Sequence, residues 1–266
     1  MKELLKRLLS RWPVLYKLAA KVYANLRFSL LLEYIIGTKA REREWAIRHL
    51  KKGNDWGNIK HSGAENEWVL GYWDSREHSH RALLQKKIAE LSPISSVLEI
   101  GCNCGPNLYL IARRFPDIKI QGIDINPIAI DKGKELLAAE GITNVNLSIV
   151  KADELGDFPD KSFDVVFTDA VLIYVGRDKI KQVLKEMVRI TNKGMILLEH
   201  QCSGFGNGDR LTLGIRHNGL WQRDYEALLK LITPESTIQI TKVTEDIWPD
   251  KEWQETGAII KVRLPK

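Results

Sequence analysis

Short apolar runs alternate with amphipathic stretches from residue 95 to the C-terminus, and this alternation constrains the fold more than any other feature. The runs that predict strands are SSVLEIG, IKIQGIDI, VNLSIVKA, SFDVVFTDA, GMILLEHQ, TIQITKV and AIIKVRL. The stretches that predict helices are residues 80–91, NLYLIARRF, NPIAIDKGKELLAAEG, DKIKQVLKEMVRIT and WQRDYEALLKLI. Such alternation implies a parallel sheet covered by helices on both faces, which is an α/β fold.

Ligands of such sheets bind outside the carboxyl ends of the strands, so the residues that follow the predicted strands are the first candidates for a site. A glycine-containing turn over 101–105 follows the first strand and starts a helix, whose N-terminal end carries partial positive charge. Carboxylates follow the first three strands, and no Lys or Arg lies between 99 and 107. This pocket would repel the pyrophosphate of a dinucleotide and attract a cationic small molecule, which counts against a dehydrogenase.

The segments VLEIGCNCGPN, GIDINP and VKADELGDFPDKSFDVVFTDAVL resemble the motifs of class I S-adenosylmethionine-dependent methyltransferases, of the type 11/25 kind, in their order and usual separations. The resemblance covers residues 80–266. It implies a Rossmann-like three-layer sandwich around a seven-stranded, mostly parallel sheet whose last strand is antiparallel. It also implies S-adenosylmethionine as the cofactor.

The resemblance further implies a set of cofactor-binding residues along these motifs. Asp124 would hold the ribose hydroxyls, and Asp153 would lie beside the adenine amino group. Arg81 could meet the methionine carboxylate of the cofactor, or it could simply be solvated at the start of a helix. The predicted cofactor-binding residues are Arg81, Glu99, Gly101, Cys102, Asn103, Gly105, Asp124, Ile125, Ala152, Asp153, Glu154 and Asp169.

Asn103 stands where the family usually has glycine. Asparagine is the non-glycine residue that best tolerates left-handed backbone angles, so the turn is expected to survive this substitution. Cys102 and Cys104 are expected to be small turn residues, because a C-x-C pair and six scattered histidines have no metal-ligand spacing. No metal site is predicted.

A methyl group on a sulfonium is already a strong electrophile, so the protein must align an acceptor and, for a hydroxyl, remove a proton. The predicted candidates for the base are Tyr174, Glu199 and His200, with His217 in the following loop. His200 has the most suitable ordinary pKa. Alternatively, His200 caps its strand or shapes the cleft, and Tyr174 serves in packing.

The acceptor is expected to be selected by the glycine-rich loop 202–219. The stretch from Trp221 to Tyr225, with Trp248 and Trp253, resembles methyltransferases associated with bacterial surface-sugar biosynthesis, including a pseudaminic-acid-associated group. The predicted function is therefore methyl transfer to a small-molecule or glycan hydroxyl, such as a sugar of a lipid-linked precursor. The alternatives are N- or C-methylation of another metabolite, and a non-catalytic module that binds the cofactor.

Residues 1–80 are predicted to form a basic, amphipathic helical extension followed by a loop-rich cover that folds over a cleft, and residues 81–266 the cofactor-binding domain. Residues 1–52 hold 13 Lys and Arg against 4 Asp and Glu. The helices of this segment would pack on the domain or lie on an anionic membrane surface. Charged residues interrupt its apolar stretch, so no membrane span is predicted. Sparse cysteines favour a cytoplasmic protein, and nucleic acid is not an expected partner because no reading motif occurs.

Overall fold

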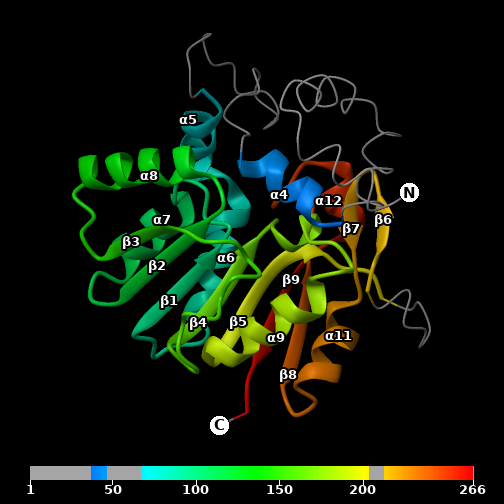
Figure 1. The fold of residues 1–266 in the computed structure, drawn as a ribbon. Helices are drawn as coiled ribbons and strands as arrows, with labels where there is room; N and C mark the ends of the chain where they lie inside the picture. Colours follow the sequence, from blue (N-terminus) through cyan, green and yellow to red (C-terminus); the bar gives the residue numbers. More distant parts are fainter. Residues whose placement is uncertain (1–36, 47–66, 204–212, 266) are drawn as a thin grey trace.

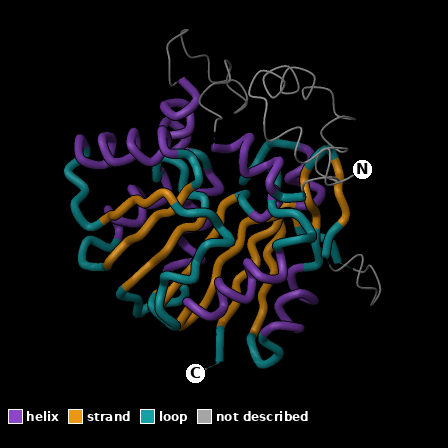
Figure 2. Tube along the Cα trace, viewed as in Figure 1, coloured by secondary structure: helices purple, strands orange, loops and turns teal. Residues whose placement is uncertain are grey.

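A computed structural model describes residues 37–46, 67–203 and 213–265 of the chain. The amphipathic helices predicted for the segment before Gly37 lie outside these residues. Figure 1 and Figure 2 show one central sheet with helices on both of its faces, and the helix α4 lying across one edge of that sheet. No helix within the described ranges is long and apolar enough to cross a membrane.

The helices and strands follow the alternation predicted from the sequence. The strands are β1 Ser96–Ile100, β2 Lys119–Asp124, β3 Val145–Ile149, β4 Phe163–Asp169, β5 Thr191–His200, β6 Ile215–His217, β7 Leu220–Gln222, β8 Thr237–Lys242 and β9 Gly257–Arg263. The α-helices are α4 Lys39–Ala46, α5 Glu67–Asp74, α6 Ser79–Ala89, α7 Pro106–Arg114, α8 Pro127–Ala139, α9 Ile180–Ile190, α11 Tyr225–Ile232 and α12 Lys251–Thr256. Two short 3-10 helices, η2 Ser75–Glu77 and η3 Leu172–Tyr174, complete the described elements.

The main sheet has seven strands in the order β3-β2-β1-β4-β5-β9-β8. Strands β1 to β5 pair in parallel, whereas β9 runs antiparallel to both β5 and β8. The predicted seven-stranded sheet with an antiparallel last strand is confirmed. Because β1 lies between β2 and β4, the chain crosses over after β3, and the carboxyl ends of these strands open a crevice at this point.

Each face of the sheet buries its own apolar cluster, because successive side chains of a strand point to opposite faces. Val97 and Ile196 belong to the cluster under α6, α7 and α8. Their neighbours Leu98 and Leu197 belong to the cluster under α9 and α11. All four side chains are fully buried. The two-sided burial explains why these strands have continuous apolar runs in the sequence.

One predicted helix is shorter than its amphipathic pattern indicated. Residues 221–232 were expected to be helical throughout, but Leu220–Gln222 forms the strand β7, which pairs with β6 in a separate hairpin. The helix α11 begins only at Tyr225, because the side chain of Asp224 accepts a hydrogen bond of 3.0 Å from the N–H of Ala227 and caps its first turn.

The predicted loop-rich cover contains two helices within its described residues. Helix α4 lies over the end of the sheet and α5 leads through η2 into α6. Helix α4 lines the cavity described below.

Candidate functional site

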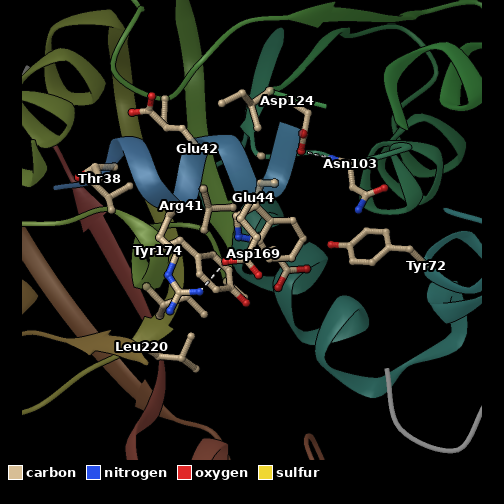
Figure 3. Close-up of a pocket in the computed structure, with 18 of the residues that line it drawn as sticks. Thr38, Arg41, Glu42, Glu44, Tyr72, Asn103, Asp124, Asp169, Tyr174 and Leu220 are labelled. Atoms are coloured by element: carbon tan, nitrogen blue, oxygen red, sulfur yellow. Dashed lines mark hydrogen bonds and ion pairs between the residues drawn. The ribbon is translucent and has the colours of Figure 1, made fainter. Parts of the chain in front are cut away.

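A cavity of about 760 Å³ lies at the crevice where β1, β2 and β4 end. The strands contribute Gly101 after β1, Asp124 at the end of β2 and Asp169 at the end of β4. Helix α4 closes the opposite side, as Figure 3 shows, and the segment before α12 adds aromatic side chains. The volume suits a nucleoside-sized ligand together with part of a second molecule.

The turn after β1 is held in a conformation that its sequence explains. Gly101, Asn103 and Gly105 all have positive φ angles, of 75°, 52° and 82°. A Cβ atom on Gly101 would lie 2.2 Å from Cγ2 of Val171, so only glycine fits there. Asn103 adopts the left-handed angles expected of it, and its Oδ1 accepts a hydrogen bond of 2.7 Å from the N–H of Cys104. The backbone at this turn therefore lines the cavity closely.

Asp124 is anchored by backbone donors on both of its oxygens. Its Oδ2 accepts from the N–H of Asn103, and its Oδ1 from the N–H of Asn126, each at 2.8 Å. The first of these bonds is drawn in Figure 3. Burial raises the pKa of this carboxyl above its ordinary value, against the lowering effect of the backbone bonds. A carboxylate held this way keeps lone pairs for the hydroxyls of a ligand.

Asp169 presents one occupied and one free oxygen. Its Oδ2 meets His80 Nε2 at 3.1 Å, Arg81 Nη1 at 3.2 Å and Asn107 Nδ2 at 2.9 Å. Its Oδ1 is buried without a hydrogen-bond partner among the described residues. Burial alone would raise the pKa of Asp169, but the interactions with His80 and Arg81 hold it well below its ordinary value. The charged Oδ1 is therefore suited to a cationic ligand group.

Of the twelve predicted cofactor-binding residues, the structure brings seven to the cavity wall. Besides those already described, Ile125, Ala152 and Asp153 lie there. The remaining five, which do not line the cavity, are Arg81, Glu99, Cys102, Gly105 and Glu154.

Each of these five residues has other surroundings that explain why it does not line the cavity. Arg81 is fully buried and turns inward, where it donates to Asp169 and to Ser75. Glu99 accepts from Asn107 Nδ2 at 2.7 Å, and burial raises its pKa to about 8. Cys102 is buried behind the turn, and Gly105 is the N-cap of helix α7. Glu154 is exposed and pairs with Lys151 at 2.6 Å.

Of the three predicted base candidates, one lines the cavity and two do not. Tyr174 lines the cavity, where its ring lies 4.8 Å from that of Trp45. Glu199 is buried away from the cavity, and its oxygens accept from the backbone N–H groups of Val171, Leu172 and Ile173 at 3.0 to 3.1 Å. These bonds tie Glu199 to the segment after β4.

His200 is also displaced from the cavity wall. Its Nδ1 lies 2.7 Å from Oγ1 of Thr256, and its ring packs 4.4 Å from that of Trp253. Burial lowers the pKa of His200 to about 4. The structure therefore places His200 behind the wall instead of on it, because the antiparallel neighbour β9 and helix α12 cover it.

Helix α4 supplies lining residues that the sequence did not single out. Arg41, Glu42, Glu44 and Trp45 all face the cavity from it, and Figure 3 shows the first three on this helix. Lys179, at the start of α9, pairs with Glu42 and also with Asp153 at 2.5 Å. The pairs tie the cover to the side of the cavity predicted to hold adenine. Only the aromatic and glycine content of residues 39–80 hinted at this cover.

Two tryptophans near α12 form another part of the wall. The rings of Trp248 and Trp253 stack 4.1 Å apart at an interplanar angle of 8°, and both line the cavity. Asp250 and Glu252 lie beside them on the same wall. Within the described part of the chain, no group of three or more His, Cys, Asp or Glu side chains could hold a metal ion.

Comparison with known proteins adds family relationships to this geometry. A family model described as a methyltransferase domain matches residues 97–194. The chain is 26% identical over 162 residues to an uncharacterized protein of Haemophilus influenzae, which covers 60% of this chain and 57% of that protein. It is 29% identical over 116 residues to malonyl-(acyl-carrier protein) O-methyltransferase 1 of Ilyobacter polytropus, covering 42% of this chain and 38% of that enzyme. The match thus spans about two fifths to three fifths of these relatives.

Solved structures share the fold at low sequence identity. Magnesium protoporphyrin IX methyltransferase of Synechocystis PCC 6803, solved with bound S-adenosylmethionine, superposes with a TM-score of 0.55 at 12% identity, covering 86% of this chain and 97% of that one. The (4+2)-cyclase SpnF superposes with a TM-score of 0.52 at 19% identity, covering 79% and 85%. The family match runs from β1 to the start of β5, and with these likenesses it leads to one conclusion: residues 97–194 carry a methyltransferase domain, within the Rossmann-like fold of the class I S-adenosylmethionine-dependent methyltransferases.

Proposed function

We propose that the protein is an S-adenosylmethionine-dependent methyltransferase whose acceptor is a hydroxyl group of a sugar or of a lipid-linked glycan precursor. The observation that carries the cofactor part is the free, buried Oδ1 of Asp169 beside the anchored carboxylate of Asp124. A buried carboxylate oxygen without a partner favours a bound cation, because leaving it unpaired costs free energy.

The residues on the cavity wall fit this cofactor. In this proposal Asp124 accepts from the ribose hydroxyls, and Asp169 accepts from the ammonium group. Ile125 and Ala152 offer an apolar site for adenine, with Asp153 at its edge. When bound, the cofactor supplies a methyl group activated by its sulfonium. The chain's own side chains must then bind and orient the acceptor, exclude water and receive a proton.

The charge of the cavity supports a cationic ligand over a dinucleotide. Among the described lining residues, seven are Asp or Glu and three are Lys or Arg. Two of the three cations are engaged by carboxylates of the same wall, since Arg41 pairs with Glu44 and Lys179 with Asp153. The net charge is therefore negative, which attracts a sulfonium and repels a pyrophosphate.

The acceptor part of the proposal rests on the wall formed by α12 and the segment before it. Trp248 and Trp253 offer aromatic surface, onto which sugar rings pack through their C–H faces. Asp250 and Glu252 offer carboxylates that accept hydrogen bonds from sugar hydroxyls. An aromatic surface flanked by acceptors favours a polyhydroxylated acceptor over a purely apolar one.

Calorimetric titration with S-adenosylmethionine tests the cofactor part. The protein is expected to bind it and to leave NAD unbound. Ala152→Phe, which fills the predicted adenine site, should abolish binding, whereas Ala138→Phe on the exposed face of α8 should not. A folded protein that binds no S-adenosylmethionine, or that prefers NAD, would refute the proposal.

Incubation with cofactor labelled in its methyl group tests the acceptor part. Extracts are separated into sugars, lipids and amines, and label is expected in sugar or glycolipid fractions. Label confined to amines would show N-methylation and contradict the glycan assignment. Cofactor binding without transfer to any fraction would favour a non-methylating role, a possibility raised by the cyclase that has this fold.

A further inference from the structure

Two histidines form a chain of contacts that runs from Asp169 to the cavity. His80 Nε2 lies 3.1 Å from Oδ2 of Asp169, and the Nδ1 atoms of His80 and His78 lie 2.5 Å apart. His80 is buried, with 1% of its surface exposed, whereas His78 is half-buried and lines the cavity. His78 stands at the N-cap position of helix α6, where its Nδ1 can either accept from the backbone N–H of His80 or donate to His80 Nδ1, but not both.

The proton positions along this chain follow from its end at Asp169. That carboxylate is ionised and can only accept, so His80 Nε2 must donate. Burial lowers the pKa of His80 to about 4, so its ring is neutral near pH 7 and its Nδ1 has a lone pair. The short Nδ1–Nδ1 contact then needs a proton from His78 Nδ1.

The same reasoning gives the protonation of the other ring nitrogen of His78, Nε2. A neutral imidazole has one N–H, so Nε2 of His78 has a free lone pair. No described residue makes a hydrogen bond to this atom. The backbone N–H of His80 also approaches Nδ1 of His78, but at 3.5 Å it is far longer than the contact between the rings. The sequence did not single out His78 as a base, because neither its tautomer nor its partners are visible there.

Trp248 holds both rings in place at the acceptor side of the cavity. The ring of His80 stacks on it at 4.3 Å with an interplanar angle of 24°, and the ring of His78 lies 5.1 Å from it. Trp248 in turn stacks on Trp253. The histidine chain therefore joins the cofactor side, at Asp169, to the aromatic wall proposed to hold the acceptor.

We propose that His78 is the general base of the reaction and that His80 and Asp169 position it, an inference that rests on the proposed methyl transfer to a hydroxyl. The acceptor O–H bond breaks and its proton moves to Nε2 of His78. The acceptor oxygen forms a bond to the methyl carbon, and the carbon–sulfur bond breaks with its electron pair left on sulfur. The imidazolium formed at His78 loses its proton to solvent afterwards.

The groups around His78 determine the direction in which its pKa is shifted. Burial lowers its pKa first, the neighbouring Arg81 lowers it further, and Asp169 raises it, with a net shift below the ordinary value. Asp250 and Glu252 line the same cavity, and His80 is neutral near pH 7. The base is thus unprotonated at neutral pH, and turnover should fall only on the acid side of pH 6.5.

Nitrogen NMR of the histidine side chains tests the arrangement without any turnover. In protein labelled with ¹⁵N-histidine at pH 7.5, His80 should carry its proton on Nε2 and His78 on Nδ1, assigned by loss of signals in the single variants. His80→Gln keeps an N–H donor for Asp169 but has no acceptor at the position of His80 Nδ1, so His78 should then become a mixture of tautomers. A His78 ring protonated on Nε2 in the unaltered protein would overturn the proposal.

Kinetics with the extract fraction that takes up label test the catalytic role. His78→Asn keeps an N–H near the position of Nδ1 and can still cap α6, but it has no base. Its kcat should fall about 100- to 1,000-fold, with loss of the acid limb of the pH profile. His80→Gln should lower kcat less than His78→Asn does, and it should change the pH at which activity falls on the acid side. Lys86→Gln, exposed on the same helix, serves as the matched control and should match the unaltered protein.

Calorimetry separates failure of this inference from failure of the proposed function. S-adenosylmethionine should bind His78→Asn and the unaltered protein within about twofold of each other, since His78 touches only the acceptor in this scheme. If the unaltered protein binds the cofactor and methylates, and His78→Asn does so at the same rate, His78 is not the base. If the unaltered protein neither binds nor methylates, the proposed function itself is wrong.

Discussion

The backbone N–H of Asn103 donates a hydrogen bond of 2.8 Å to Oδ2 of Asp124. This bond joins the turn after β1 to the end of β2, two segments that are separated by the whole of helix α7. It orients the carboxylate toward the cavity and holds the asparagine in its left-handed conformation. One residue thus shapes the turn while the other is free to bind a ligand.

Asp124→Asn should weaken the binding of S-adenosylmethionine by about 10- to 100-fold, because the ribose loses a charged acceptor worth about 1.5–3 kcal/mol. The new amide also places an N–H against the N–H of Asn103 or Asn126. Isothermal titration calorimetry measures the change, with Asp131→Asn on the exposed face of α8 as control. Equal affinities for the two variants would refute the ribose assignment.

Gly101→Ala should destabilise the protein by at least about 2 kcal/mol, since a positive φ and a crowded Cβ both oppose alanine there. Its Cβ would meet Val171, which lines the cavity, so cofactor affinity should fall as well. Gly156→Ala is the matched control, because nothing lies within 4 Å of a Cβ at that position. Denaturant unfolding measures the stability of the two variants. An unfolding midpoint of Gly101→Ala equal to that of the control would contradict the expectation.

Thr38→Val tests whether α4 retains the ligand. The hydroxyl of Thr38 donates to Oδ1 of Asp178 at 2.6 Å and accepts from the N–H of Gly176 at 2.8 Å. Valine keeps the shape but leaves the N–H of Gly176 without its acceptor, and Asp178 keeps only the longer bonds of 3.2 and 3.3 Å from the backbone N–H of residue 38. This loss costs about 1–3 kcal/mol. Stopped-flow measurement should show S-adenosylmethionine dissociating several-fold faster. The exposed Thr237→Val on β8 provides the comparison, and identical dissociation rates would mean that α4 does not act as a cover.

His200→Asn should reduce the sensitivity of stability to acid. The folded pKa of His200 is about 4, below the ordinary 6.5 that it regains on unfolding. The unfolded chain therefore binds the proton first, and stability falls as pH drops from 6.5 toward 4. Between pH 7 and pH 5 the unaltered protein should lose roughly 1–2 kcal/mol more than the variant. Urea unfolding at the two pH values measures this, and parallel losses would count against a neutral buried His200.

Trp253→Leu should raise the KM for the acceptor and leave the affinity for S-adenosylmethionine unchanged. Trp253 stacks on Trp248 and lines the cavity, on the wall proposed to hold the acceptor. Loss of one aromatic surface for a sugar is expected to weaken binding by about 1 kcal/mol, or roughly fivefold. Steady-state kinetics with the labelled fraction would show it. An increase in the cofactor Kd instead would place the tryptophan pair on the cofactor side.

The order of strands and helices was predictable from residue 95 onward, because two-sided burial leaves continuous apolar runs in strands and one-sided burial leaves periodic patterns in helices. The site at the carboxyl ends followed from the same pattern. Asp124 and Asp169 reach one cavity because parallel strands bring their ends to one edge of the sheet. Local chemistry also sufficed for Asn103, whose side chain tolerates positive φ.

Contacts between residues far apart in the chain determined the other features of the site, which the sequence did not predict. Arg81 turns away from the cavity because Asp169, 88 positions later, accepts its hydrogen bond. Glu199 is occupied by backbone donors of the segment after β4, and Thr38 docks α4 onto Asp178 across 140 positions. Sequence periodicity reports which face of an element is buried and nothing about which polar partner it meets there. The path from Asp169 through His80 to His78 therefore exists only in the tertiary structure, where packing fixes both the partners and their protons.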